Sequence, residues 1–506
     1  MKRKFLSILL TLAMALTLLP VSAMAEETPV EAPAETKVAQ IGDAKYDTLQ
    51  AAVDAANDGD TITLLKSGNG NGVSVPANKF INEGVTVDFN GCTYMVGGQL
   101  VGSAGTGTNA FQLNAGNKLT FKNGRIVGAT KGSKPADDTP NWHGAPAIVI
   151  QNYCDLTLDN MTVTGGDETV YTMSNNCGNV VIKDTVINPG MAKGYGYGPY
   201  AFDVYGGFQS YGDVTVTVEG ASVINGNIEI NHGTGNNNVN TLIVKAGTVN
   251  GNIKKTNGNL TITGGTFTSD VSAYLSSGYI QNENGAVETL GETNAVAKIS
   301  GTYYKTLADA VTAADTTTTV TLLKDTTENV TIPTGKTITL DLNGKTLSGG
   351  TNNNKAALLN NGTVTIKDSS ATKTGTIKRE DDADNTGTSY YVIKNLGTMT
   401  IEQANVINHS GYKKTNPSGS MVGSSLICNG DREDDQVTTL TINDGVFEQQ
   451  NFLAVKNGTM GILNVNGGKF TSKHSAIQNW YKADIKGGEI NGQLWTDAFT
   501  WGENGY

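Results

Sequence analysis

One short phrase recurs along this chain, and it limits what the chain can fold into. Its clearest copies are LTITGGTF at 260–267, LTINDGVF at 440–447 and LNVNGGKF at 463–470. Looser copies begin at Leu119, Leu156, Leu242, Met399 and Ala483. The phrase returns at intervals of roughly 18 to 26 residues, a spacing typical of solenoid repeats. The chain is therefore expected to consist of many copies of one small unit.

Each phrase has the pattern of a β-strand that ends in a tight bend. Its first and third residues are apolar and its second is usually Thr, so the side chains alternate between an interior and a wet face. Gly, Asn or Asp then supplies the bend. In LTITGGTF the pattern places Leu260, Ile262 and Phe267 inside, with Leu440, Ile442 and Phe447 as counterparts. One such strand cannot bury its apolar face alone, so the units must stack.

Upstream of most copies an asparagine stands two residues after an apolar residue, as in IQN and VKN. The positions are Asn152, Asn395, Asn429, Asn457 and Asn479. Asn tolerates the left-handed backbone of a bend, and stacked Asn amides can bond to the units above and below. A parallel β-coil with an asparagine ladder at one corner explains this recurrence. An antiparallel sandwich also suits short strands and turns, but it does not explain the repeated corner residue.

The chain contains a duplication of its opening segment. YDTLQAAVDAANDGDTITLLK at Tyr46–Lys66 returns as YKTLADAVTAADTTTTVTLLK at Tyr304–Lys324. In the first copy the apolar residues have helical spacing and Thr48 can cap the helix. A strand follows, and later an Asp-x-Asn-Gly turn, at 88–91 and again at 341–344. Two tandem units are therefore expected, each opened by a short amphipathic capping helix.

These motifs resemble a known class of proteins. The chain is similar to pectin-lyase-like right-handed parallel β-helices, and more closely to repetitive exported surface proteins of gut Firmicutes. The shared motifs are the Y-x-T-L-x-x-A-V openings, DLNGKTL at 341–347, the LTIxGGTF rungs and GGTFTSDVSAYLSSGY at 264–279. The resemblance covers nearly all of the mature chain. It implies an all-β fold of right-handed β-helix type, and it says little about activity because one fold hosts many functions.

The ends of the chain suggest a domain plan. Residues 1–25 have a basic start, an apolar stretch and the small-residue site Ala23-Met24-Ala25, as in a secretory signal peptide. Residues 26–38 form an acidic tether rich in Pro and Ala. The first β-helix is expected at 39–290 with a closing segment, and the second at 296–506 without a C-terminal cap. The expected location is secreted or on the cell surface, with no membrane span after cleavage.

Composition narrows the partners and cofactors. Removing the three basic residues of the signal peptide from 36 leaves 33 against 47 acidic residues, a net charge of −14. An acidic protein of this kind is a poor binder of nucleic acid. The four histidines have no metal-ligand spacing, so neither zinc nor another cofactor is expected.

Two of the four cysteines occupy matching corners. Cys154 in QNYC and Cys177 in SNNC lie at one position in consecutive units. Adjacent coils are about 4.8 Å apart, so a disulfide and two reduced thiols are both possible at this stage.

Three insertions, two of them long and the middle one shorter, indicate where function lies. They follow Val127, Val163 and Ile187, and all leave the same corner on consecutive coils. Aromatic rings beside hydroxyl and acidic groups suit sugar rings, which have an apolar face and a polar rim. The candidate glycan-binding residues are Asp137, Asp138, Trp142, His143, Asp167, Glu168, Tyr195, Tyr197 and Tyr200. The three tyrosines are expected to be exposed; solvated loops that pack on the coil are the plain alternative.

These patterns favour one function over another. The preferred hypothesis is adhesin-like binding of extracellular glycan or host glycoprotein, without catalysis. The alternative is a polysaccharide lyase or glycoside hydrolase acting in a groove along the helix. A lyase needs a basic residue, often with acidic calcium ligands. Arg379 and Arg432 lie in acidic loops and are expected to be solvated charge partners. No catalytic residue is assigned.

Overall fold

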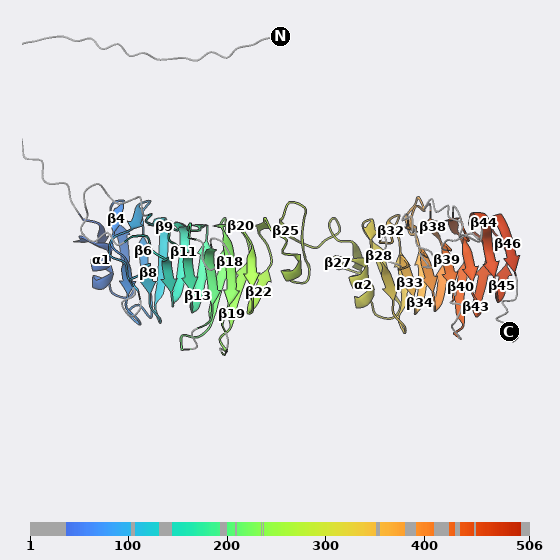
Figure 1. The fold of residues 1–506 in the computed structure, drawn as a ribbon, viewed down its shortest axis with the longest axis horizontal. Helices are drawn as coiled ribbons and strands as arrows, with labels where there is room; N and C mark the ends of the chain where they lie inside the picture. Colours follow the sequence, from blue (N-terminus) through green and yellow to red (C-terminus); the bar gives the residue numbers. More distant parts are fainter. Residues whose placement is uncertain are drawn as a thin grey trace, which may run out of the picture.

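The computed structural model describes residues 37–102, 107–130, 144–192, 200–207, 210–233, 235, 237–350, 355–379, 391–408, 425–430, 436–449 and 452–496. Within these residues the chain is mostly β-strand, in long parallel sheets compatible with a β-helix or solenoid. Figure 1 shows the strands in two stacks that follow one another along the long axis. The signal peptide and nearly all of the tether lie outside the described residues.

The first stack combines a sixteen-stranded and a seven-stranded sheet. The larger sheet contains β1 (Ala39–Ile41), β2 (Ala44–Tyr46), β3 (Thr61–Leu64), β4 (Gly68–Gly70), β6 (Val85–Asp88), β7 (Thr93–Val96), β9 (Lys118–Gly128), β11 (Asp155–Thr164), β13 (Gly178–Lys183), β14 (Val186–Asn188), β16 (Val214–Glu219), β17 (Val223–Asn225), β19 (Asn240–Val244), β20 (Thr248–Asn250), β22 (Asn259–Ile262) and β23 (Thr266–Phe267). The smaller sheet contains β5 (Val73–Val75), β8 (Asn109–Leu113), β10 (Ile148–Asn152), β12 (Tyr171–Asn175), β15 (Tyr200–Tyr205), β18 (Asn227–Asn231) and β21 (Ile253–Lys255). The 3-10 helix η3 (Ser272–Tyr274) and the hairpin β24 (Tyr279–Gln281) and β25 (Val287–Thr289) follow.

The second stack combines a nine-stranded and a twelve-stranded sheet. The first of these contains β26 (Ala297–Ile299), β27 (Thr302–Tyr304), β28 (Thr318–Leu322), β31 (Thr337–Asp341), β34 (Thr363–Lys367), β37 (Thr398–Ile401), β40 (Thr438–Ile442), β43 (Gly461–Val465) and β45 (Lys482–Ile485). The other contains β29 (Thr326–Thr327), β30 (Val330–Ile332), β32 (Thr346–Ser348), β33 (Leu358–Asn360), β35 (Thr376–Arg379), β36 (Ile393–Asn395), β38 (Ala404–Asn408), β39 (Ile427–Asn429), β41 (Gly445–Gln449), β42 (Val455–Asn457), β44 (Lys469–Asn479) and β46 (Glu489–Thr496).

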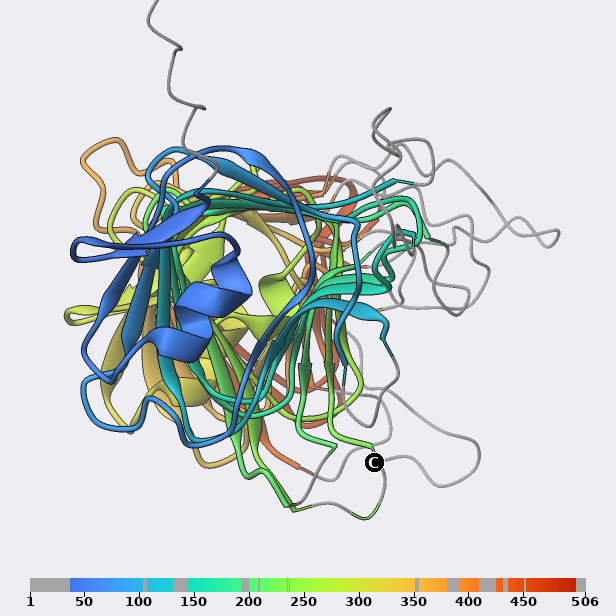
Figure 2. The same ribbon diagram turned by 90° about the vertical axis from the view of Figure 1, so that its left-hand side faces the viewer.

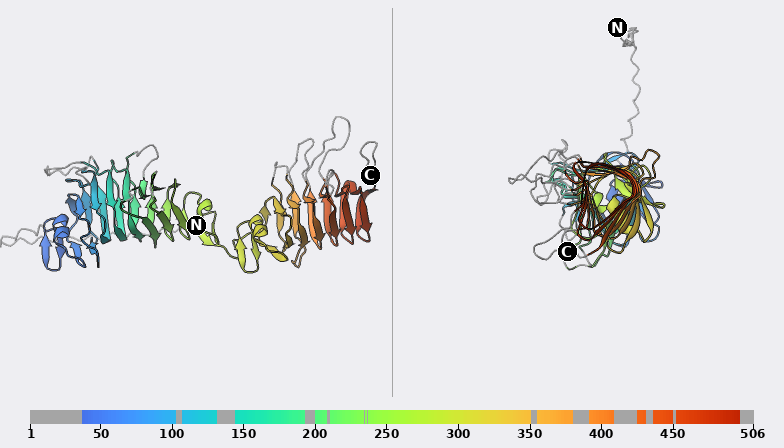
Figure 3. Two further views of the ribbon diagram at one scale, coloured as in Figure 1. Left: turned by 90° about the horizontal axis from the view of Figure 1, so that it is seen from below. Right: turned by 90° about the vertical axis from the view of Figure 1, so that its right-hand side faces the viewer.

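Consecutive copies of the phrase pair in parallel. Leu242 is the register partner of Leu260 in the first stack, and Leu440 that of Leu463 in the second. The antiparallel sandwich is therefore wrong for these copies. Ile262, Phe267, Leu440, Ile442 and Phe447 are buried, while Leu260 is half-buried against the core. Figure 3 shows the second stack end-on, with its strands around a common centre that the buried side chains fill.

The two expected helices open the stacks. In α1 (Leu49–Ala55) the Thr48 hydroxyl accepts a hydrogen bond from the Ala51 amide, and Leu49 is buried. In α2 (Leu307–Ala313) Thr306 caps the Asp309 amide in the same way. These caps satisfy amides that a helix start leaves without an intrahelical partner. Figure 2 shows α1 lying across the N-terminal end of the first stack.

The asparagine ladder forms in the second stack. Side-chain Nδ2 atoms donate to the next Oδ1 at 2.7 Å at each step, in the order Asn360, Asn395, Asn429, Asn457 and Asn479. The first four are fully buried, and Asn479 nearly so. Buried amides are costly without partners, so the ladder ties each coil to the next at one level. Sequence reasoning found four of the five members and missed Asn360.

At the equivalent corner of the first stack the asparagine side chains form different hydrogen bonds. Asn152 pairs in register with Asn175, but the strands on either side place Leu113 and Val204 there. The Asn152 and Asn175 amides instead donate to the backbone carbonyls of Cys154 and Asp203, both at 3.0 Å. A separate ladder runs along the larger sheet of this stack, from Asn250 through Asn225 to Asn188 at 2.8 and 2.7 Å.

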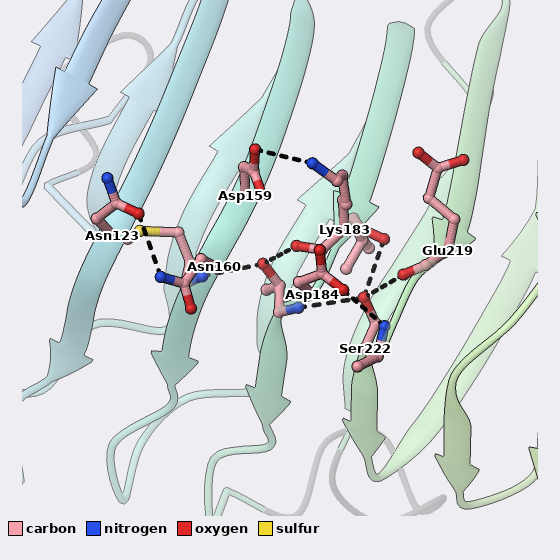
Figure 4. A network of polar contacts seen from close by, with 11 residues as sticks. Asn123, Asp159, Asn160, Lys183, Asp184, Glu219 and Ser222 are labelled. Carbon is pink, nitrogen blue, oxygen red and sulfur yellow. Dashed lines mark hydrogen bonds and ion pairs between the residues drawn. The ribbon is translucent and has the colours of Figure 1, made fainter.

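Alternating charges run along the outer face of the larger sheet. In register order the residues are Asp88, Lys122, Asp159, Lys183, Glu219 and Lys245. Each lysine lies within 3.5 Å of an acid in this row, including Lys183 with Asp159 at 3.2 Å. Figure 4 shows this pair beside the Asn123–Asn160 contact at the next turn. Such surface pairs are individually weak, but opposite charges in adjacent strands favour the observed register.

The acidic residues around Arg379 in the sequence indicated a solvated side chain, but the structure buries it. Its side chain is 1% exposed at the end of β35, after the inward residue Ile377. The guanidinium donates from Nη2 to the Gly350 carbonyl at 3.0 Å and from Nη1 to the Lys355 carbonyl. The prediction that Arg379 is solvated is therefore wrong, because its guanidinium turns inward to donate to backbone carbonyls. Arg432 lies outside the described residues.

We expect the Asn429→Ala variant to lose about 1–3 kcal/mol of unfolding free energy, because the buried Asn457 Oδ1 loses its donor from Asn429. Denaturant unfolding measures the loss. The matched control is Asn466→Ala, which removes an exposed Asn–Asn contact of 2.8 Å and should cost less than about 0.5 kcal/mol. Equal losses in the two variants would show that burial of the ladder contributes nothing.

Candidate functional site

The described ends of the three insertions meet at one corner of the first stack. Each insertion joins a strand of the larger sheet to the next strand of the smaller sheet. The Thr169 hydroxyl accepts from the Gly166 amide at 2.9 Å and donates to the Pro146 carbonyl at 2.7 Å. The Met191 amide donates to the Gly166 carbonyl at 2.9 Å. The prediction that the insertions leave the same corner on consecutive coils is thus confirmed for these ends.

The predicted site residues divide into three groups. Asp137, Asp138, Trp142, His143, Tyr195 and Tyr197 lie outside the described residues, so their assignment stays a prediction. Asp167 and Glu168 are half-buried in the short turn between β11 and β12. Tyr200 is the first residue of β15.

Tyr200 is buried, which corrects the expectation that it would be exposed. It is 3% exposed, and its ring stacks on that of Tyr171 with centroids 4.9 Å apart and planes 23° apart. The physical reason is the parallel register, which places Tyr200 directly beside Tyr171 at the start of adjacent strands. Stacked rings exclude water from each other and add to area burial. By contrast, Phe202 and Val204 lie in the core, as their alternation predicted.

A row of polar side chains lies on the outward face of the smaller sheet. We call it the first outer column. In register order it contains Ser74, Gln112, Gln151, Ser174, Asp203, Glu229 and Lys254. The neighbours of Asp203 along β15 are core residues, so its side chain leaves the opposite face. Each coil contributes one residue, and successive members are about 4.8 Å apart.

Asp203 is the most deeply buried acid of this column. Its Oδ1 accepts from the Asn175 backbone amide at 2.8 Å and its Oδ2 accepts from the Ser174 hydroxyl at 3.1 Å. Burial raises its pKa to about 7, with a further increase from the negative charge of Glu229, although the two hydrogen bonds oppose the shift. Asp203 therefore titrates near neutral pH.

Glu229 links the column to the stacked rings. Its Oε2 accepts from the Tyr171 hydroxyl at 2.7 Å, and its Oε1 pairs with the Lys254 ammonium at 2.9 Å. Burial, together with the hydrogen bond to Glu229, raises the pKa of Tyr171 well above its usual value. The Tyr171 phenol therefore stays protonated and remains a donor across the physiological range.

A second aromatic pair lies on the other side of the column. Tyr153 follows Gln151 by two residues, and its ring lies 4.8 Å from that of Tyr211. Tyr211 is 46% exposed. Burial raises the pKa of Tyr153 to about 12, with smaller contributions from Tyr211 and Asp203. The column is thus flanked by the Tyr171–Tyr200 pair, of which Tyr200 is buried, and by the Tyr153–Tyr211 pair, of which Tyr211 is accessible.

Cys154 and Cys177 are free thiols in this structure. The Cys177 thiol donates to the Tyr153 carbonyl at 2.8 Å, and that of Cys154 to Asn152 Oδ1 at 3.3 Å. Burial raises the pKa of Cys177 to about 11 and that of Cys154 further. Neither thiol is therefore a ready nucleophile, because the thiolate is the reactive form.

Comparisons with known proteins give no relative from which to assign a function. No protein-family model matches the chain, and no curated protein or solved structure is significantly similar to it. In the described part of the chain, no three metal-ligating side chains lie together. No helix in that part is long and apolar enough to cross a membrane.

Sequence reasoning missed Asp203, Glu229 and Lys254. It assigned function to the insertions, whereas these residues lie on regular strands. A signal was present, since Asp203 interrupts the apolar run AFDV at 201–204 at a position where β-strand alternation directs the side chain outward. Partners such as Ser174, 29 residues away, come from other coils and give no local signal.

We expect the contribution of Asp203 to the stability of the protein to decrease as the pH rises. Its folded pKa of about 7 lies above the ordinary aspartate pKa of 3.8, so between these values the folded state holds a proton that the unfolded state releases. This contribution is complete below about pH 4 and is lost as the pH rises through about 7. The free energy of unfolding should therefore decrease more between pH 5 and pH 8 in the wild type than in the Asp203→Asn variant.

The control for this measurement is Glu219→Gln, which removes a surface ion pair with Lys245. It should keep the wild-type pH profile. An Asp203→Asn variant with the same profile as the wild type would contradict a buried, protonated Asp203.

Proposed function

We propose that the chain is an exported extracellular protein that binds glycan along the first outer column, without catalysis. We further propose that each stack is a separate right-handed parallel β-helix of the pectin-lyase-like kind, at 39–290 and 296–506. The stacked parallel sheets and separate cores support this arrangement, and parallel crossovers are nearly always right-handed. Secretion rests on the sequence of residues 1–25.

The observation that carries the binding proposal is the composition of the column and its flanks. Glu229 and Lys254 form an ion pair of 2.9 Å beside the Tyr171 ring, on a backbone fixed by strand pairing, and the Lys254 side chain is the more exposed of the two, at 39% against 14%. Sugar rings need an apolar face to stack on and fixed polar partners at their rim. Tyr211 offers an accessible ring, while Tyr171 holds Glu229 in place. A rigid site of this kind loses little entropy on binding.

A second candidate, glycoside hydrolysis, is favoured by one observation. Asp203 and Glu229 are register partners on adjacent strands, and the pKa of Asp203 suits a general acid near pH 7. Paired carboxylates are what this reaction requires. Against it, Asp203 is only 7% exposed and both of its oxygens accept hydrogen bonds from protein groups. Glu229 is engaged in the same way, so binding is the better-supported function.

Retention on immobilised polysaccharides and glycans tests the proposal. We expect the full chain to be retained, and Tyr211→Ala and Glu229→Gln each to weaken binding about tenfold or more, which is about 1.4 kcal/mol. The control is Tyr274→Ala, an exposed tyrosine in η3 that is not a member of the column, which should bind as the wild type does. Melting temperatures confirm that each variant is folded.

Two other outcomes would overturn parts of this proposal. Retention of no glycan at all, or equal loss in the Tyr274→Ala control, would remove the first outer column as a binding site. Release of reducing sugars or unsaturated products by the wild type, abolished in Glu229→Gln, would establish catalysis in place of simple binding.

A further inference from the structure

The C-terminal end of the first stack has open strand edges. β22 ends the main path of the larger sheet and pairs with β19, and β21 ends the smaller sheet and pairs with β18. Figure 1 shows β22 at the end of the first stack that faces the hairpin of β25. Both strands lie within residues 237–350, which the structure describes without a gap. An open edge leaves backbone N–H and C=O groups without strand partners.

The hydrogen bonds within each sheet show which backbone groups face the open side. The Thr256 amide donates to a carbonyl of β18 at 3.0 Å, and the Thr263 amide donates to a carbonyl of β19 at 2.9 Å. Successive residues of a strand direct their backbone groups to opposite sides, so those of Lys255 and Leu260 point away from β18 and β19. These two residues therefore offer N–H and C=O groups at the open corner between β21 and β22.

The chain after β23 cuts across this end of the stack and does not add a full coil. The Ser269 hydroxyl donates to the Gly251 carbonyl at 3.1 Å, just before β21, and Leu275 forms a parallel bridge with Ile262 in β22. Between these two contacts the chain passes through η3, in fewer residues than the coil before it uses for the same path. The shorter path leaves the corner between β21 and β22 open.

A hollow of about 520 Å³ lies at this corner, and we call it the end hollow. Its volume falls within the range of about 300–1,000 Å³ that small-ligand sites have. The half-buried Leu260 and Leu275 give it an apolar side, and Tyr274 is 36% exposed. The strands and the segment of η3 both line it, with Lys255, Leu260, Thr261, Ala273, Tyr274 and Leu275 among the lining residues.

Lys255 is a cation at an inward position of its strand. Its register partner on β18 is Ile230, which is fully buried in the core. Because the chain takes the shorter path beyond β21, the Lys255 side chain remains exposed. In the described part of the chain it has no ion-pair partner. An inward lysine at an edge opposes pairing with an apolar strand, so the end hollow favours a segment that brings a negative charge.

We propose that the end hollow binds the C-terminal carboxylate of a short extended peptide. The N–H and C=O groups of Leu260 offer the backbone pairing by which peptides add to an open sheet edge. The Lys255 ammonium pairs with the terminal carboxylate, and the last side chain of the peptide lies against Leu260 and Leu275. The bridge between Ile262 and Leu275 closes one end of the hollow, so a chain end fits there and a continuing strand does not.

Fluorescence anisotropy of a labelled peptide with the full chain at low salt tests this inference. The probe is fluorescein–Gly-Thr-Val-Thr-Val with a free C-terminus, and the comparison peptide is the same sequence ending in an amide. We expect the free carboxylate to bind about fivefold more tightly, and this difference to shrink as salt screens Lys255. Lys255→Gln should weaken binding of the free-carboxylate peptide about fivefold, whereas Lys255→Arg should keep most of it.

The matched control is Lys245→Gln. Lys245 directly follows β19, pairs with Glu219 and is not among the residues that line the end hollow. This variant should bind the probe as the wild type does. Equal weakening in it, or equal binding of the two peptides by the wild type, would overturn a local carboxylate site. Tighter binding of an amidated peptide that ends in Glu would overturn the C-terminal assignment and make this a site for an acidic side chain.

The end hollow and the first outer column can fail independently as sites. Tyr211→Ala and Glu229→Gln should leave peptide binding unchanged, and loss of binding in them would place the peptide in the first outer column instead. Tyr274→Ala removes a ring from the hollow, so it should weaken peptide binding while glycan retention persists. The melting temperature of Lys255→Gln, which alters an exposed side chain, guards against a folding defect.

Discussion

The architecture depends on a requirement that buried amides impose. An asparagine side chain inside the coil needs donors and acceptors there, and in the second stack the next asparagine supplies them at 2.7 Å. This contact forms only when adjacent coils are parallel and in register, because a shift of one residue would turn the amide to the other face. The same alignment extends to every position on the strand. Apolar residues then align in the core, and the residues on the opposite face align with one another, as in the first outer column.

Much of the fold follows from local pattern. The alternation in LTITGGTF sets which residues are buried, and the helical spacing after Thr48 predicts α1 with its cap. What sequence could not give is the identity of a residue's neighbours on the next coil. Asn152 has the sequence of a ladder residue, yet Leu113 lies beside it and no ladder can continue. The burial of Arg379 could not be predicted for a related reason, since the carbonyls that bind it belong to residues 24 and 29 positions earlier.

The candidate site was only partly accessible to sequence reasoning. The corner from which the insertions leave could be predicted because loops repeat with the coils, and its described ends do meet there. The first outer column could not be predicted from the sequence, because an acidic residue on the outward side of a strand is usually just a solvated residue. Its chemistry depends on contacts between residues far apart in the sequence. Tyr171 donates to Glu229 across 58 residues, and burial in the folded chain raises the pKa of Asp203. Tyr200 was wrongly predicted to be exposed in a loop, because the Gly- and Pro-containing sequence before it gave no sign that a strand begins there.

The parallel register also determines how such a surface can change over evolutionary time. Each coil places one side chain in an outer column, at a spacing fixed by backbone hydrogen bonds and independent of that side chain. A substitution therefore rewrites one position of a linear array without moving its neighbours. Gain or loss of an entire coil would lengthen or shorten the array by one strand spacing, about 4.8 Å, and leave the order of the rest intact. Two copies of one ancestral unit could in this way acquire different outward side chains while keeping the same kind of core.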